Sequence, residues 1–307
     1  MSVILPPSLR DNARIGLICP AGGFENYRPI KSTVEYLKKL GFKVRIGNHI
    51  ISNSSSYKYL SSIDENRIKD FIDFWNDDSI DAIFCLRGGY GSLKLLEKID
   101  FAKLVRRNKI FIGYSDITVL LLALYFKLNL VTFHGPMLGI DFFKTTSSSV
   151  NKFSERNLWK ILRENQFLFS YSYRSSIVIS PGRANGVLLG GNLSCIASMI
   201  GSAFLPSFKN SILFLEDCNE DMYRIDRYLT QLKNAGIFNN LKGLIFSNFQ
   251  NCKFTKEQFV RLVKDILKKD KFPILYGFPI GHCSSNLTLP LGLKVTLDAN
   301  LRTLIRE

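Results

Sequence analysis

The chain has 307 residues, of which 46% are hydrophobic, and a formal net charge of +15. Its length and apolar content allow one large domain or two modest domains with a sizeable core. The sequence predicts no membrane-spanning helix, because no apolar run reaches the roughly 18 to 20 residues that such a helix needs.

Charge and cysteine usage narrow the class of protein further. Lysines and arginines are spread along the chain without a dense basic run interleaved with aromatic residues. The charge therefore indicates solvated surface with some attraction for acidic small substrates, and nucleic-acid binding is the lesser alternative. The six cysteines are scattered without a C-x-x-C pair, and several lie in apolar runs. Together with an N-terminus that lacks a secretory-signal pattern, they predict reduced thiols and a cytoplasmic protein.

The first half of the chain alternates predicted strands and helices. One helix carries Ile30, Val34 and Leu37 at helical spacing before Gly41, and another follows a capping box of Ser62 and Glu65. Strands alternating with helices predict a parallel sheet covered on both faces, with ligands at the carboxyl ends of its strands. The predicted strands are residues 14–19, 42–46, 80–86, 110–112 and 130–133.

The character of the chain changes between residues 141 and 182. A polar run at residues 145–149 precedes a helix around Leu158, and residues 171–176 look like an exposed connector. These features predict a domain boundary, with one domain over residues 1–165 and another over residues 166–307.

The second half has shorter strands and fewer crossovers, which predicts a smaller α+β domain. Its strands are expected near residues 187–189, 212–215 and 243–246, and Thr255 with Gln258 opens a capped helix. The alternating tail, residues 292–304, predicts a strand pair.

Ser115 lies where the strand at residues 110–112 gives way to the apolar helix from residue 119. A sharp turn there would lift the hydroxyl clear of the backbone, and free N–H groups at the start of the helix could hold an anion beside it. That arrangement suits a serine nucleophile, although a serine before an apolar helix is more often an N-cap. A glycine-rich turn over residues 87–92 also follows a predicted strand.

A serine nucleophile needs a base, and the base needs an orienting acid. The chain has only three histidines, His49, His134 and His282. His49 has no polar glycine-rich context and is predicted to lie on the surface, whereas His134 ends a strand and His282 lies at a strand-to-loop junction. Glu216, at the end of an apolar strand, is the candidate acid, and Asp217 beside it is a rival.

Six motifs together resemble the LD-carboxypeptidase family of serine peptidases, which includes the murein tetrapeptide carboxypeptidases and the microcin C immunity peptidases. They occur in the family's order and span nearly the whole chain. They are Arg87-Gly88-Gly89-Tyr90-Gly91, Gly113-Tyr114-Ser115-Asp116, His134-Gly135-Pro136-Met137, Gly190-Gly191-Asn192-Leu193, Leu215-Glu216-Asp217, and Gly281-His282 with Leu289-Pro290-Leu291-Gly292.

The resemblance implies a doubly wound, flavodoxin-like α/β domain that carries the nucleophile Ser115 and a C-terminal domain that carries Glu216 and His282. It implies a Ser-His-Glu triad with an oxyanion hole from the N–H of Asp116 and one from the Gly88-Gly89 turn. It also implies a homodimer without metal or other cofactor, which removes terminal D-alanine from murein tetrapeptides during peptidoglycan recycling. The substrate carries several carboxylates, for which Arg87 is a candidate partner.

Two other functions remain open. A microcin C-type peptidyl-nucleotide hydrolase carries an extra loop with an aromatic side chain that stacks on the base, and residues 179–187 are too short for it here. A non-catalytic small-ligand binding protein would use Ser115 only as a helix cap, so that Ser115→Ala would leave ligand affinity intact.

Overall fold

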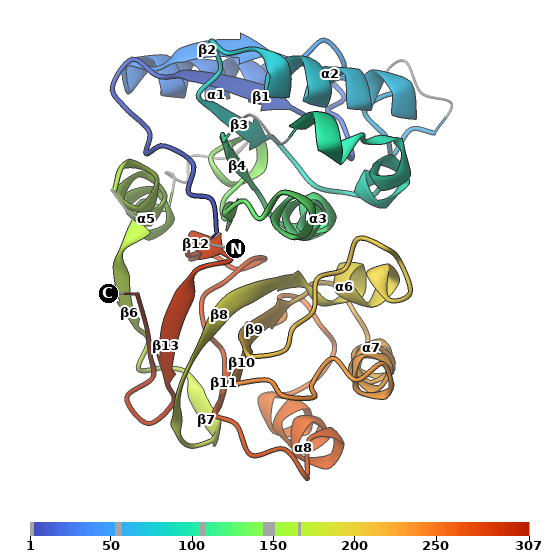
Figure 1. Ribbon diagram of the computed structural model, residues 1–307, viewed down its shortest axis with the longest axis vertical. Helices are drawn as coiled ribbons and strands as arrows, with labels where there is room; N and C mark the ends of the chain where they lie inside the picture. The colour runs from blue at the N-terminus through green and yellow to red at the C-terminus, as the bar shows by residue number, and fades with distance from the viewer. Residues whose placement is uncertain (1–2, 53–56, 105–107, 144–150, 165–166, 307) are drawn as a thin grey trace.

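The computed structural model describes residues 3–52, 57–104, 108–143, 151–164 and 167–306. Two β-sheets lie one above the other, the first half of the chain forming most of the upper one and the second half the lower one (Figure 1). No helix in the described ranges is both long enough and apolar enough to cross a membrane.

The first sheet has six strands in the order β12-β5-β4-β3-β1-β2. Its first five strands in the chain run parallel, as the alternating sequence predicts, and β12 pairs antiparallel with β5. The central strands β3 and β4 are buried throughout, which explains why they read as unbroken apolar runs. The strands are β1 (Arg14–Ile18), β2 (Lys43–Ile46), β3 (Ala82–Cys85), β4 (Ile110–Gly113), β5 (Thr132–His134) and β12 (Leu289–Leu291).

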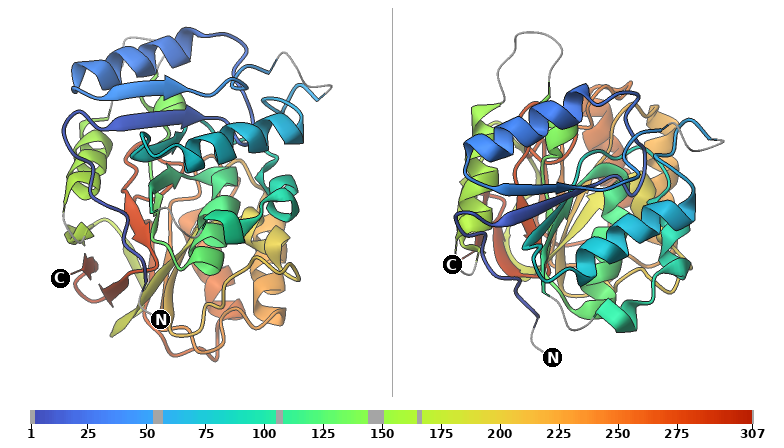
Figure 2. Two further views of the ribbon diagram at one scale, coloured as in Figure 1. Left: turned by 45° about the horizontal axis from the view of Figure 1, so that its top comes forward. Right: turned by 90° about the horizontal axis from the view of Figure 1, so that it is seen from above.

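Helices cover both faces of this sheet, as a doubly wound fold requires. Figure 2 shows β1 and β2 between α1 (Arg28–Lys39) and α2 (Asp64–Asn76). The long apolar helix α3 (Thr118–Leu128) lies between the two sheets and is buried on nearly every side (Figure 1). The remaining helices of this half are the 3₁₀ segments η1 (Ser92–Lys98), η2 (Phe101–Leu104) and η3 (Ser115–Ile117), with α4 (Leu138–Asp141) and α5 (Lys152–Arg163).

The predicted capping box at α2 is wrong. The helix begins at Asp64 with Ile63 in the N-cap position, so Ser62 lies one residue too early to cap it. The Ser62 hydroxyl instead accepts a hydrogen bond from Asn66 Nδ2 at 2.9 Å. Two acidic residues in the first turn, Asp64 and Glu65, complement the helix dipole there.

The second sheet has eight strands in the order β6-β14-β13-β8-β9-β10-β11-β7. Its centre, β8 to β11, is parallel, and the outer strands pair antiparallel. The strands are β6 (Phe169–Ser172), β7 (Ile177–Ser180), β8 (Arg183–Asn192), β9 (Ser211–Glu216), β10 (Gly243–Phe246), β11 (Ile274–Tyr276), β13 (Lys294–Asp298) and β14 (Thr303–Arg306), and the helices are α6 (Leu193–Met199), α7 (Met222–Asn234) and α8 (Lys256–Ile266).

Two predictions for this half are confirmed and one is wrong. The tail forms the antiparallel pair β13 and β14, and Thr255 with Gln258 makes a capping box at α8. The expected connector at residues 171–176 is wrong at its start, because Tyr171 and Ser172 belong to β6, which pairs with β14. Alternate residues of this edge strand face solvent, which gives it the polar composition of a loop.

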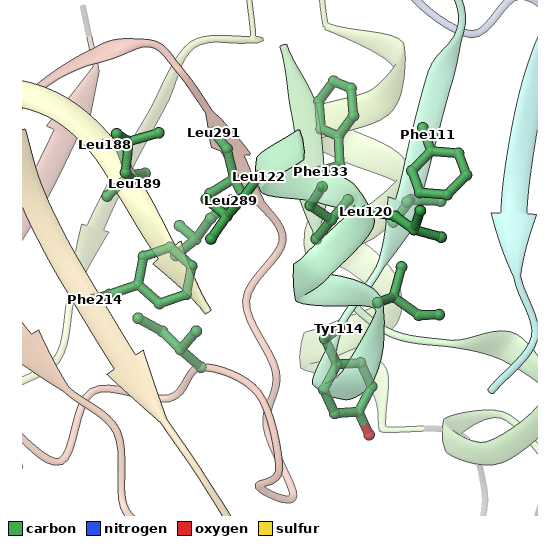
Figure 3. Packing of buried hydrophobic residues seen from close by; sticks show 14 of the residues in the cluster. Phe111, Tyr114, Leu120, Leu122, Phe133, Leu188, Leu189, Phe214, Leu289 and Leu291 are labelled. Carbon is green, nitrogen blue, oxygen red and sulfur yellow. The ribbon is translucent and has the colours of Figure 1, made fainter. Parts of the chain in front are cut away.

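The two halves share a continuous core. β12 comes from the second half of the chain but completes the first sheet beside β5. In Figure 3, Leu289 and Leu291 of β12 lie between Phe133 of β5 and the side chains of the second sheet, such as Phe214. The predicted boundary between residues 165 and 166, and the polar run at 145–149, lie outside the described residues.

Candidate active site

Ser115 lies at a strained turn between β4 and α3. Its φ angle is +62°, in the left-handed region, while Tyr114 before it is extended. A non-glycine residue held in this region costs on the order of 1–3 kcal/mol. Ser115 makes no capping hydrogen bond to η3 or α3, so its interpretation as an N-cap is wrong. The strained turn instead leaves the side chain half-buried at the carboxyl edge of the first sheet.

The glycine-rich turn after β3 packs directly against Ser115. A Cβ added at Gly88 would lie 2.9 Å from Ser115 Cβ and 3.0 Å from its Oγ, so only glycine fits there. Gly22 N donates a hydrogen bond to the Gly88 carbonyl at 3.0 Å, and Asp116 Oδ2 accepts one from Ser92 N at 2.8 Å. The first bond joins the glycine-rich turn to the loop after β1, and the second joins it to the turn that carries Ser115.

The Arg87 side chain packs against the loop after β1. Its Nη1 donates a hydrogen bond to the Gly23 carbonyl at 2.6 Å, and its guanidinium lies 5.6 Å from the centre of the Phe24 ring. Arg87 therefore links the glycine-rich turn to the loop after β1. Its predicted role as a partner for substrate carboxylates stays a prediction.

Glu216 and His282 form a short, partly buried pair. His282 Nδ1 lies 2.6 Å from Glu216 Oε2, and the His282 backbone N–H donates to the same oxygen at 3.1 Å. Glu216 ends β9 and is fully buried, whereas the His282 side chain keeps 21% of its surface exposed. Gly281, at a φ of +75°, brings the backbone against the carboxylate, where a Cβ would overlap it. The pair occupies Nδ1, so that Nε2 is the ring nitrogen of His282 turned away from Glu216.

Charge coupling shifts the two pKa values in opposite directions, each toward the charged form of its group. Burial raises the pKa of Glu216, but the charge and hydrogen bond of His282 lower it further than burial raises it. Burial lowers the pKa of His282, but the Glu216 carboxylate and the Cys218 thiol outweigh that and raise it. An imidazolium at His282 is therefore stabilised, which is what a base needs after it accepts a proton.

His282 lies against the residue that precedes Ser115. Its ring packs edge-on to the Tyr114 ring with centroids 4.9 Å apart. Within the described residues, the Ser115 hydroxyl donates no hydrogen bond to His282. Catalytic hydrogen bonds are often long without substrate and shorten in the complex, so this geometry agrees with a nucleophile and a base at one edge.

The structure separates Glu216 from its rival Asp217, which faces the opposite side of the strand end. Asp217 accepts hydrogen bonds from Asn192 Nδ2 at 3.0 Å and Ser194 N at 2.9 Å. Burial, together with the neighbouring charge of Glu216, raises the pKa of Asp217 to about 6. Asn192 belongs to the sequence motif at residues 190–193. No feature of the sequence predicted that Cys218 lies near His282.

The other two histidines lie outside the pair. His49, predicted to be a surface residue, is half-buried, and its Nδ1 lies 3.0 Å from Asp70 Oδ1. His134 is fully buried between the rings of Tyr114 and Phe214. Burial lowers its pKa to about 4. Because its side chain is fully buried, His134 does not offer a surface to a ligand.

Comparisons with known proteins agree with this geometry over most of the chain. Residues 15–135 match the family model of the LD-carboxypeptidase N-terminal domain, and residues 185–297 match that of the C-terminal domain. The chain belongs to the LD-carboxypeptidase family. This assignment supports a hydrolase of the serine peptidase type.

Among the residues described here, no group of three or more His, Cys, Asp and Glu side chains is arranged to hold a metal ion.

Relatives of this LD-carboxypeptidase family member cover nearly its full length. A probable murein peptide carboxypeptidase of Bacillus subtilis (strain 168) is 32% identical over 98% of this chain and 94% of its own. The structure of the microcin C7 self-immunity protein MccF superimposes with a TM-score of 0.89 at 25% identity over 98% of both chains. A muramoyltetrapeptide carboxypeptidase from Oxalobacter formigenes has a TM-score of 0.81 at 27% identity, over 96% of this chain and 99% of its own.

Proposed function

We propose that this protein is a serine LD-carboxypeptidase that removes terminal D-alanine from murein tetrapeptides. The observation that carries the proposal is the partly buried Glu216–His282 pair, at 2.6 Å, beside the strained turn of Ser115. The names of the relatives favour a murein peptide as the substrate. Since the product is a tripeptide fit for re-use, the proposed setting is peptidoglycan recycling in the cytoplasm, and the proposed assembly is a homodimer.

In the proposed mechanism, Ser115 Oγ attacks the carbonyl carbon of the bond to D-alanine. His282 Nε2 takes the hydroxyl proton and later returns it to the leaving amine, while Glu216 orients and stabilises the imidazolium. Water then enters after D-alanine departs and hydrolyses the acyl-enzyme, with His282 again acting as the base. The strained turn serves this chemistry because it holds the Ser115 hydroxyl against the Gly88 turn.

The proposed oxyanion hole consists of backbone N–H groups beside Ser115. The N–H groups of Asp116, Gly88 and Gly89 donate no hydrogen bond to another described residue, so they are available to an anion. Each such donor typically contributes about 3 kcal/mol to stabilisation of the transition state.

The test is D-alanine release from a purified murein tetrapeptide, with and without a chelator. We expect release by the wild type that is indifferent to the chelator. Ser115→Ala should lower the rate by about 10⁶-fold and Glu216→Gln by about 10⁴-fold. No release by the wild type from any murein tetrapeptide would refute the proposal, and so would full activity of Ser115→Ala.

A peptidyl-nucleotide substrate is the second candidate, because the MccF structure superimposes with a higher TM-score than the murein enzyme, 0.89 against 0.81. One feature opposes it. The segment expected to hold the extra aromatic loop is here a two-residue connection between β7, which ends at Ser180, and β8, which begins at Arg183. Hydrolysis of a peptidyl-nucleotide faster than of the tetrapeptide would favour this second candidate.

A further inference from the structure

Three exposed tyrosines form a cluster at the edge of the first sheet. Tyr57, Tyr59 and Tyr90 are 55%, 53% and 51% exposed, respectively. The ring centroids of Tyr57 and Tyr59 lie 5.5 Å apart, and those of Tyr59 and Tyr90 lie 5.9 Å apart. Lys94 Nζ lies 5.6 Å from the centre of the Tyr57 ring. These three side chains are called the tyrosine platform below.

The tyrosine platform adjoins the turn that packs against Ser115. Tyr90 follows Gly88 by two residues, so their Cα atoms are at most about 7 Å apart. The carbonyl oxygen of Tyr59 lies 3.3 Å from the Cβ position of Gly22, whose N–H donates to the Gly88 carbonyl. Two separate segments therefore bring aromatic rings to the rim of the same site.

The fold does not account for this exposure. Five tyrosines with more than half of their surface exposed are found in the described chain, and in three of them the central ring, Tyr59, contacts the other two. The rings of the platform are tilted by 31° and 62° to one another, so their faces are not closed against each other. Clustered, exposed aromatic rings at the rim of a site are typical of a ligand contact.

We propose that the tyrosine platform binds the muramyl sugar of a sugar-linked stem peptide. This inference rests on the proposed function, which puts the bond to D-alanine at Ser115. The sugar then lies about three residues upstream, or on the order of 10 Å along an extended peptide. That reach matches a platform adjoining the Gly88 turn.

The chemistry of the platform matches a pyranose ring. A pyranose presents an apolar C–H face to an aromatic ring, and its hydroxyl groups can bond phenol oxygens at the edge. The tilted rings suit a puckered ring better than a flat base, which stacks best between parallel aromatic planes. Lys94, whose Nζ lies near the Tyr57 ring and 3.9 Å from Asp64 Oδ1, adds a positive charge beside the platform.

The test compares kcat/KM for D-alanine release from an N-acetylmuramyl-linked tetrapeptide and from the free tetrapeptide. Tyr59→Ala is expected to lower the ratio of the two values by about tenfold, mainly through KM of the sugar-linked peptide. Phe126→Ala is the matched control, because Phe126 is 46% exposed on α3. It lies about 12 Å along the helix from Thr118, away from the site. The control should keep the wild-type ratio.

A ratio unchanged by Tyr59→Ala would overturn the proposal, and so would an equal loss in Phe126→Ala. If the ratio is unchanged but adenosine monophosphate inhibits the wild type and not Tyr59→Ala, the platform binds a base and the sugar proposal is wrong. Should the wild type release no D-alanine, the proposed function fails separately. The affinities of Ser115→Ala protein for the two peptides, with and without Tyr59→Ala, then decide the role of the platform by the same ratio.

Discussion

Gly281→Ala tests whether the backbone at Gly281 sets the position of the Glu216–His282 pair. A Cβ at this position would lie 2.5 Å from Glu216 Cγ and closer still to the carboxylate, where ordinary contact begins at 3.4 Å. The closest contact would be with Glu216 Oε2 at 2.3 Å, so relief needs a shift of about 1.1 Å, which would stretch the 2.6 Å hydrogen bond to His282 to about 3.7 Å. Because a misplacement of about 1 Å can cost 10²-fold in rate, we expect kcat to fall about 100-fold.

Backbone strain has to be separated from this displacement. An alanine at a positive φ costs roughly 1–2 kcal/mol wherever it occurs. Gly201→Ala is the matched control, since Gly201 has a φ of +88° and nothing within 4 Å of its Cβ position. The assay measures kcat for D-alanine release and Tm for both variants. Values of kcat within threefold of each other at equal Tm would refute the reasoning.

Three further predictions concern separate parts of the molecule. Burial lowers the pKa of His134 from 6.5 to about 4, so stability is fully present above pH 6.5 and is lost as the pH falls. Between pH 7 and pH 4, the free energy of unfolding measured in urea should fall by about 3 kcal/mol more for the wild type than for His134→Asn. An equal fall in the two proteins would contradict this prediction. Gly88→Ala should lower kcat at least tenfold, because its Cβ would meet Ser115 Cβ at 2.9 Å. A wild-type kcat for D-alanine release by this variant would count against the prediction. Thr255→Ala should lower the free energy of unfolding by about 1 kcal/mol, because it removes the capping box of α8, and an unchanged denaturation midpoint would argue otherwise.

Elements with a strong periodic pattern were predictable from the sequence. The parallel strands β1, β3 and β4 are short apolar runs, and α1 shows one apolar face through Ile30 and Leu37. The edge strands β6 and β12 were not predictable in this way. β6 has the composition of a loop because one of its faces meets solvent, and β12 is three residues long with Pro290 at its centre.

The sequence by itself determined which residues were candidates for the site and that several of them would follow strands. It did so because glycines, a serine and buried apolar runs impose local backbone geometry. Only the tertiary structure decided that Glu216, and not Asp217, meets His282. Adjacent residues at the end of a strand point in opposite directions, and which of them faces a loop 66 residues away depends on how the sheets pack. The sequence likewise did not predict the tyrosine platform, because Tyr59 and Tyr90 are distant in the chain and only the fold places their rings in contact.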